Sequence, residues 1–232
     1  SFEMAKIEYI LEKYVNYSNY QSKREFFDYM GSIDTEIVSL TQIVDDSIVF
    51  DARINTLNQW ATEYTKEDIA NELNILSRNG ESRNAILRVI DKPTRFEFLT
   101  SIALKQNFVD LDVRPNYHID DEGLPTFTAS GGVADIECYD TDCNSLVEVT
   151  LMCARNQATN EMPAITRHLQ EAIEKEPNIT QFSILVAPSI HADTKYMAGY
   201  SKYQYGINIL TLTIAEFIEQ ICVNRRIVEM LP

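Results

Sequence analysis

Residues 134–151 read "ADIECYDTDCNSLVEVTL", two short strand-like segments on either side of a turn. Apolar and polar residues alternate in each segment, which is typical of a β-strand with one buried face. The central "DTDCN" is rich in residues that favour turns. The sequence therefore predicts two strands that can pair as an antiparallel hairpin.

The same alternation assigns the side chains to faces of the sheet. Glu148 faces away from the apolar Val147 and Val149, which we expect in the core. Asp135 faces away from Ile136 in the first strand. If the two strands pair, the carboxylates of Asp135 and Glu148 converge near one end of the sheet.

Two carboxylates a few ångströms apart repel each other, and their pKa values rise unless a cation lies between them. Oxygen ligands of this kind suit Mg²⁺, which proteins usually hold with one or two carboxylates. The spacing alone leaves a second interpretation open, a pair of solvated acids on an exposed face of the sheet.

Around the hairpin the pattern predicts an α/β fold with a mixed central sheet flanked by helices, preceded by an α-helical region. "KPTRFEFLTSIALKQ" predicts a helix with Pro in its first turn. "DLDVRPNYHI" predicts a strand that joins the hairpin in an antiparallel meander. Helices and strands then alternate: "EMPAITRHLQEAIEK", "FSILVAP", "TKYMAGYSKYQ", "INILTL" and "IAEFIEQICVNRRIVEML".

Residues 1–90 have helical periodicity. "MAKIEYILEKY" places its apolar residues on one face, and "TKEDIANELNILS" opens with a capping-box pattern at Thr65 and Asp68. The polar "SRNGESRN" at 77–84 is the best candidate for a boundary. We therefore expect a helical linker or subdomain over 1–90 and a catalytic domain over 91–232. Because the chain begins with Ser1, we treat it as a fragment.

The net charge of the chain argues against strong binding to nucleic acid. There are 35 Asp and Glu against 20 Lys and Arg, a net charge of −15. DNA binding draws much of its strength from cations that neutralise phosphates, so we expect weak intrinsic affinity for nucleic acid. No apolar run reaches the ~18 residues of a membrane helix, and no signal peptide opens the chain. We expect a soluble intracellular protein with no membrane partner.

Four cysteines occur, at positions 138, 143, 153 and 222. Cys138 and Cys143 with His118 or His191 could build a zinc site, but a second close-spaced pair is missing. Free thiols are the favoured interpretation.

Three further residues could join the carboxylate pair. Glu161 and His168 are two helical turns apart and so share a face, and Asn160 is a natural N-cap for that helix. Glu97 lies between two phenylalanines in "FEFL". The alternatives are a structural histidine and an exposed helix glutamate.

The order of these features resembles the core of PD-(D/E)XK nucleases: a Glu on a helix, an Asp on a strand, "EVT" on the next strand, and a following helix. More specifically, "FEFL", "DDEGLPTFTASGGVADIE", "VEVTL", "EMPAITRHL" and "SILVAPSI" resemble the cleavage domain of type IIS restriction and nicking endonucleases of the AlwI family. The resemblance covers residues 93–218.

The resemblance implies a prokaryotic, cytoplasmic, Mg²⁺-dependent deoxyribonuclease domain that cleaves double-stranded DNA. Its sequence specificity would come from a separate recognition domain or large subunit, and a homodimer or heterodimer would cut both strands. The matching positions are Asp135 and Glu148 with the backbone carbonyl of Val149 as metal ligands, and Glu97, Glu161 and His168 as further catalytic residues.

Two positions depart from the wider superfamily. Ala134 replaces a Pro, which we expect to matter little, and Thr150 replaces the Lys that usually orients the attacking water or stabilises charge. Glu161 and His168 are the nearest candidates to take over that task.

Two rival hypotheses remain: a non-catalytic module that pairs with a cleaving partner, and a hydrolase of another phosphodiester. For the aromatic run "YMAGYSKYQY" at 196–205, core packing is favoured over a partner-facing role.

Overall fold

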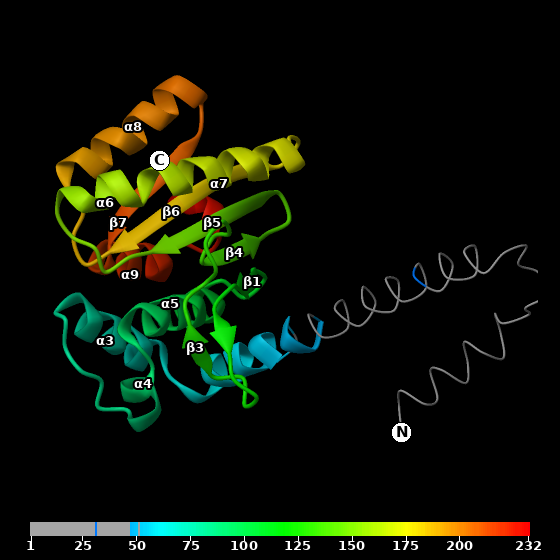
Figure 1. Ribbon diagram of the computed structural model, residues 1–232, viewed down its shortest axis with the longest axis vertical. Coiled ribbons are helices and arrows are strands. Elements are labelled where there is room, and N and C mark those ends of the chain that lie inside the picture. Colours follow the sequence, from blue (N-terminus) through cyan, green and yellow to red (C-terminus); the bar gives the residue numbers. More distant parts are fainter. Residues whose placement is uncertain (1–30, 32–46, 51) are drawn as a thin grey trace, which may run out of the picture. The chain divides into compact units, whose positions relative to one another are not determined.

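The computed structural model describes residues 31, 47–50 and 52–232. Contacts divide the chain into two units, Ser1–Ile48 and Val49–Pro232. The second unit holds every strand of the described residues (Figure 1). The helix expected within "MAKIEYILEKY" lies outside the described residues.

The elements follow one another in an α/β order. Residues 47–50 and 52–63 are helical. The later helices are α3 (Lys66–Ser77), α4 (Ala85–Val89), α5 (Lys92–Asn107), α6 (Arg155–Asn160), α7 (Met162–Lys175), α8 (Ala192–Tyr205), α9 (Ile214–Val223) and the 3₁₀ helix η2 (Ile227–Met230). The strands are β1 (Asp112–Pro115), β2 (His118–Ile119), β3 (Pro125–Phe127), β4 (Ile136–Tyr139), β5 (Cys143–Val149), β6 (Thr180–Ala187) and β7 (Asn208–Thr213).

Five strands form one mixed sheet in the order β1-β4-β5-β6-β7. β1, β4 and β5 are antiparallel, which confirms the predicted meander, whereas β6 and β7 run parallel to β5. The fold class expected from the sequence is therefore confirmed.

The small β2–β3 hairpin was not expected. "DLDVRPNYHI" is split after Pro115, and its second part pairs with β3 in a separate two-stranded sheet. Proline has no backbone N–H to extend a ladder, so a strand readily ends there. The "DDEG" turn closes this hairpin, with Gly123 at φ 84°.

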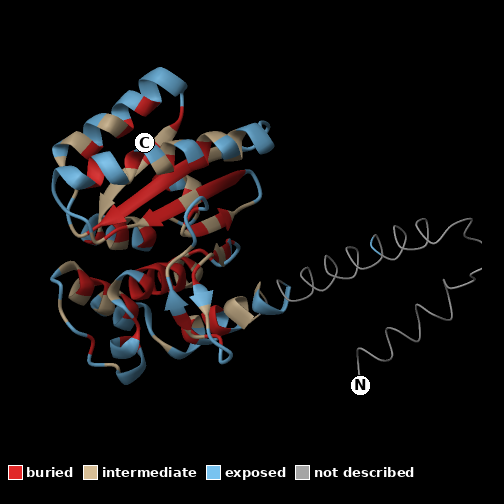
Figure 2. Cartoon of the chain, in the orientation of Figure 1, coloured by how far each residue is buried: buried red, intermediate tan, exposed pale blue. Residues whose placement is uncertain are grey.

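Helices cover both faces of the large sheet (Figure 1): α5 and α9 on one face, α7 and α8 on the other. Side chains of β5 and β6 divide accordingly. Val147 and Ile184 belong to the larger core with α5 and α9, and Leu185 packs with α7 and α8. Figure 2 shows the central strands as a buried layer between these helices.

Helix α5 is the central element of the larger core. Pro93 lies in its first turn, as predicted, and every residue from Thr94 to Leu104 is buried. A carboxylate on this helix is therefore buried whichever way it points, which decides the environment of Glu97.

Helix α3 has the predicted capping box, with reciprocal bonds between Thr65 and Asp68. Its buried residues join the same core as α5. The division by contacts falls at Val49, ahead of the loop at 77–84. A functional boundary near residue 90 stays a prediction. No helix among the described residues has the length and apolarity to cross a membrane.

Candidate active site

The β4–β5 register brings Asp135 and Glu148 together. Ile136 pairs with Val147, so Asp135 and Glu148 follow directly at the end of the ladder. Glu148 Oε2 accepts from the Asp135 N–H at 3.3 Å, and Asp135 Oδ2 accepts from the Val149 N–H at 2.8 Å. These crossed bonds fix the two carboxylates across the strands.

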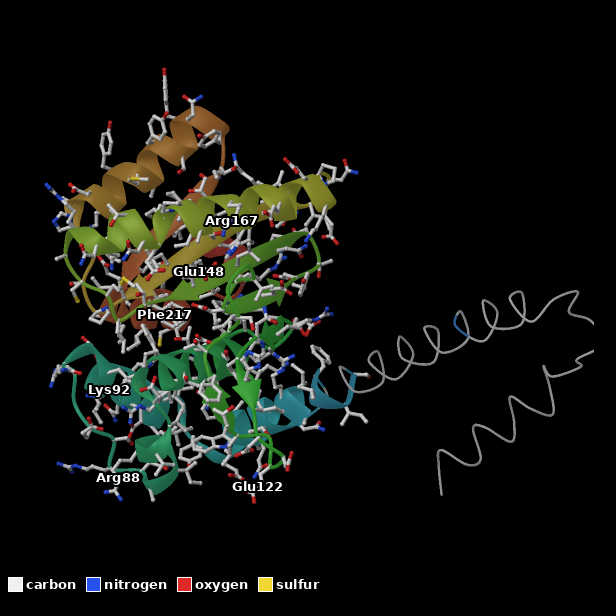
Figure 3. All side chains as sticks on the ribbon, viewed as in Figure 1. Arg88, Lys92, Glu122, Glu148, Arg167 and Phe217 are labelled. Atoms are coloured by element: carbon white, nitrogen blue, oxygen red, sulfur yellow. The ribbon has the colours of Figure 1, made fainter. Side chains whose placement is uncertain are left out.

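His168 reaches the same carboxylate from α7. Its Nδ1 lies 3.0 Å from Glu148 Oε1, and both side chains are buried. A carboxylate without a proton only accepts hydrogen bonds, so Nδ1 is the donor when it bonds one, and in that tautomer of a neutral imidazole Nε2 keeps a lone pair. Nε2 is buried and has no hydrogen-bond partner among the described residues. In Figure 3, Glu148 lies between the sheet and α7, the helix that carries Arg167.

Glu161 bonds Thr150, the residue that directly follows β5. Thr150 Oγ1 donates to Glu161 Oε1 at 2.8 Å. Glu161 and His168 thus both turn toward β5, as their spacing indicated. The expected N-cap is wrong: Asn160 ends α6, and Glu161 itself is the N-cap of α7 without a side-chain capping bond. Its carboxylate bonds Thr150 instead.

Glu97 is only 3% exposed, so the interpretation as an exposed helix glutamate is wrong. Its Oε2 accepts from the Ala129 N–H at 3.0 Å, which fastens α5 to the loop before Asp135. Burial raises the pKa of Glu97 to about 8, and the nearby Glu148 adds to the rise. The Ala129 bond lowers the pKa but does not cancel the burial.

The pKa of Asp135 is also raised well above its ordinary value. Burial is the largest cause, followed by repulsion from Glu148 and Glu97, with a smaller contribution from Glu161. Within the described part of the chain, no Lys or Arg forms an ion pair with any of these four carboxylates. We call Glu97, Asp135, Glu148 and Glu161 the acidic cluster. Carboxylate oxygens without a cationic partner are the donor set that suits a hard divalent ion.

A second acidic group lies at the other end of the hairpin. Asp140, Asp142 and Cys143 are the one group of three or more His, Cys, Asp or Glu among the described residues whose ligand atoms all lie within 4.8 Å of one another. Arg226 bonds both aspartates, reaching Asp140 Oδ2 at 3.0 Å. The guanidinium already neutralises this group, so it has little need of a metal.

The cysteines are all free, as favoured by the sequence. Cys138 and Cys143 are buried, and burial raises the pKa of both thiols. His118, one of the two candidate zinc ligands, instead lies 2.9 Å from Ser130 Oγ.

A groove runs beside the acidic cluster, between the β4–β5 hairpin and α7. Its volume is ≈ 160 Å³, and its walls include Glu137, Tyr139, His168 and Lys175. His168 therefore bonds Glu148 on one side and borders an open groove that water can enter.

Gln157 was not found by sequence reasoning. It is fully buried; its Nε2 donates to the Met152 and Ser189 carbonyls, and its Oε1 accepts from the His191 N–H and the Thr194 hydroxyl. These bonds fasten the β5–α7 connection to the start of α8. A lone Gln in a polar stretch gives no signal of this role in the sequence.

The loop that leads into Asp135 also escaped prediction as part of the site. It spans residues 128–134 and contains Gly132 at φ 98°. Ala129, Gly132 and Ala134 place it against Glu97 and the groove. It belongs to the segment matched by resemblance, but its contact with α5 is visible only in three dimensions.

Comparison with known proteins gives a consistent result. Residues 8–220 match the family model of the AlwI restriction endonuclease. Among solved structures, the small subunit of the heterodimeric restriction endonuclease R.BspD6I is similar at 25% identity and a TM-score of 0.55, covering 67% of this chain and 76% of that chain. The restriction endonuclease FokI matches at 12% identity and a TM-score of 0.46, over 73% of this chain and 33% of its own. A comparison with curated proteins found no match.

Proposed function

Because the chain belongs to the AlwI restriction endonuclease family, we propose that it is a Mg²⁺-dependent cleavage domain or subunit of a type IIS enzyme. It hydrolyses phosphodiester bonds of double-stranded DNA, with residues 91–232 as the catalytic domain. A separate recognition domain or large subunit supplies sequence specificity. The site of action is the prokaryotic cytoplasm.

The proposal rests on one observation, an acidic cluster that forms no ion pair with a Lys or Arg in the described part of the chain. Burial and mutual repulsion raise the pKa values of Glu97 and Asp135. A bound divalent cation removes that repulsion, so the cluster is more stable with the metal than without it. Asp135, Glu148 and the backbone carbonyl of Val149 would hold the ion.

The bound ion would polarise the scissile phosphate and lower the pKa of its bound water. The residues of the chain supply the rest. Glu148 Oε1 holds His168 through Nδ1, which leaves the Nε2 lone pair free to accept a proton from the attacking water. Glu97 and Glu161 accept hydrogen bonds that orient water in the cluster.

Thr150 supports this division of roles. Its hydroxyl is committed to Glu161 and to the Met152 N–H, so it cannot replace the positive charge of a lysine. His168 is the nearest side chain that can take up a proton and become positively charged. We expect in-line attack to leave a 5′-phosphate.

The net charge of −15 favours a tethered or partner-dependent nuclease. A strongly acidic chain is repelled by the DNA backbone, so it cuts efficiently only when another domain holds it on the duplex. The similar small subunit belongs to an enzyme described as heterodimeric, which supports a partner subunit here.

A non-catalytic module remains the second candidate. It is favoured by the wider spacing of the acidic cluster, whose ligand atoms do not all lie within 4.8 Å of one another as those of Asp140, Asp142 and Cys143 do. A catalytic cluster would have to close when the ion and DNA bind, whereas a non-catalytic module would have no such requirement.

Plasmid cleavage separates the two. Supercoiled plasmid is incubated with the chain in Mg²⁺ or in EDTA, and nicked and linear products are measured. We expect slow nicking in Mg²⁺ that DNA ligase can reseal, and no nicking by Glu148→Gln. Glu122→Gln is the matched control, because Glu122 is exposed on the β2–β3 turn. Equal nicking by wild type and Glu148→Gln would refute the catalytic assignment.

A further inference from the structure

The connection between β5 and α7 begins with Thr150, ends with Glu161 and contains a strained residue. Ala154 has φ 62° and ψ −160°, a combination that glycine adopts and other residues rarely do. Ala154 is exposed, so packing of its own side chain does not hold it in this conformation. Strain of this kind persists only where the surrounding structure imposes it.

Gln157 holds the turn from its buried side. Its side chain is fully buried and forms four hydrogen bonds. Nε2 donates to the Met152 carbonyl at 3.1 Å and to the Ser189 carbonyl at 3.0 Å. Oε1 accepts from the His191 N–H at 3.1 Å and from the Thr194 hydroxyl at 2.9 Å. One side chain thus joins the turn after β5 to the loop after β6 and to α8.

The four bonds explain why the residue is a glutamine. A side-chain amide has two N–H donors and an oxygen with two lone pairs, and all of them are used at Gln157. An ionised glutamate would leave the Met152 and Ser189 carbonyls without a donor and would bury a charge. An apolar side chain of the same length would form none of the bonds.

Hydrogen bonds continue from Gln157 to Glu161 by two routes. Along the backbone, the Gln157 N–H donates to the Ala154 carbonyl at 3.2 Å, and the Gln157 carbonyl accepts from the Glu161 N–H at 3.1 Å. Along the side chains, the Met152 N–H donates to Thr150 Oγ1 at 3.1 Å, and this hydroxyl donates to Glu161 Oε1 at 2.8 Å. Both the backbone and the carboxylate of Glu161 are therefore connected to Gln157.

The inner face of α8 anchors Gln157. This helix buries small residues, among them Thr194 and Ala198. Its tyrosines point outward: Tyr196 is 75% exposed and Tyr203 is 87% exposed, so the core packing expected for residues 196–205 is wrong for these side chains. The hydroxyl of Thr194, and not an aromatic ring, therefore meets the amide of Gln157.

We propose that Gln157 is a positioning residue of the active site. By holding the strained turn at Ala154, it fixes the carboxylate of Glu161 against Thr150, at the end of the strand that carries Glu148. The inference rests on the proposed function, because the role of Glu161 in orienting water gives the fixed carboxylate its purpose. The hydrogen bonds that hold the turn do not depend on that function.

Plasmid nicking by Gln157→Met tests this role. Methionine fills a similar space but forms none of the four bonds. We expect the turnover rate at saturating plasmid to fall about tenfold, because a small displacement of an active-site group is costly, while the KM for plasmid stays within about twofold of the wild type.

Gln106→Met is the matched control. Gln106 lies near the end of α5, and its Nε2 also donates to two backbone carbonyls, those of Ala61 and Tyr64. The control should lose melting temperature as Gln157→Met does, but its turnover should stay within about twofold of the wild type. Equal losses of turnover in the two variants would overturn the proposal.

A rescue separates positioning from a general loss of packing. Ala154→Gly removes the strain, because glycine adopts a positive φ without steric cost. Added to Gln157→Met, it should raise turnover by about threefold, whereas added to Gln106→Met it should change turnover by less than about twofold. A Gln157→Met chain that gains nothing from Ala154→Gly would contradict the proposal.

Hydrogen exchange monitors the turn without reference to cleavage. The N–H groups of Met152 and Glu161 should exchange about tenfold faster in Gln157→Met. Thr194→Val removes a single bond to Gln157 and is the second variant if Gln157→Met does not fold; we expect faster exchange and about threefold lower turnover.

The two measurements together separate the possible failures. Faster exchange with wild-type turnover would show that the turn does not position Glu161, and the proposal would fail. Exchange that is unchanged in Gln157→Met would show that Gln157 does not hold the turn, and the proposal would fail on that ground. A wild-type chain that shows the expected exchange but does not nick plasmid would refute the proposed function, and with it the catalytic purpose of the turn.

Discussion

The β4–β5 hairpin has acidic groups at both ends, and they differ in the cation that each has available. At the turn, Asp140 and Asp142 are bonded by Arg226, which comes from a segment far along the chain. At the open end, Asp135 and Glu148 form no ion pair with a Lys or Arg among the described residues, although Glu148 is only 8% exposed and its one basic partner is the imidazole of His168. The charge of the first group is neutralised by an arginine of the same chain, whereas the second group has no Lys or Arg to neutralise its charge among the described residues.

The comparison shows why proximity of acids is a poor criterion for a metal site. The turn group has the tighter geometry, but its charge is already neutralised. The buried cluster has the looser geometry, but burial and repulsion raise the pKa values of Glu97 and Asp135. A missing counter-charge is the better indication of function.

The largest expected difference concerns cleavage. Asp135→Asn should reduce Mg²⁺-dependent plasmid nicking by about 10³-fold, because it removes a charge that holds the ion near the phosphate. Asp142→Asn, at the other end of the hairpin, should nick at nearly the wild-type rate. Similar losses in both variants would erase the distinction between the two groups.

His168→Gln should reduce nicking by about 10²-fold, within the range of a lost general base. Glutamine keeps a polar group near Glu148 but cannot accept the proton. A variant that nicks as fast as the wild type would exclude the proton-accepting role.

The acidic cluster should also make stability depend on pH. The pKa of Glu97 rises from 4.5 to about 8 on folding, so the folded state holds a proton that the unfolded state releases. The contribution of Glu97 to the free energy of unfolding is therefore greatest below about pH 4.5. It falls as the pH rises toward 8, by an amount on the order of a few kcal/mol. Asp135 acts in the same direction.

Urea unfolding at pH 5 and pH 8 measures this slope. Glu97→Gln should flatten it, and Mg²⁺ should restore stability at pH 8 because the ion binds the folded state. A slope of the opposite sign, or one that is the same in Glu97→Gln, would show that Glu97 is not the group responsible.

Arg226→Gln should have the smallest effect. The ion pairs at the turn are partly exposed, so we expect the melting temperature to fall by about 2 °C or less, and less at high salt. Nicking should be unchanged. A large loss of cleavage would mean that the turn group contributes to the site.

The sequence alone predicts much of the hairpin and little of what surrounds it. Alternation placed Asp135 and Glu148 on one face because side chains in a strand have a period of two. The environment of Glu97 was not predictable, since the helix that carries it is buried on all sides although it contains polar residues. Arg226 reaches Asp140 across 86 positions, and no local pattern indicates such a contact.

Other differences have similar causes. Five of the six residues of α6 are polar and show no helical periodicity, so that helix was missed and the N-cap was misplaced by one residue. The tyrosines of α8 were expected in the core because aromatic residues usually are buried, but the small residues on the opposite face fill that position. Composition could not distinguish the two faces.

Titration of Mn²⁺ into the chain at pH 8, followed calorimetrically, tests the central claim most directly. We predict binding to wild type and to Asp142→Asn, and loss of binding in Asp135→Asn with the fold intact by circular dichroism. Binding that survives Asp135→Asn but disappears in Asp142→Asn, or no binding to wild type, would contradict the assignment of the metal to the acidic cluster.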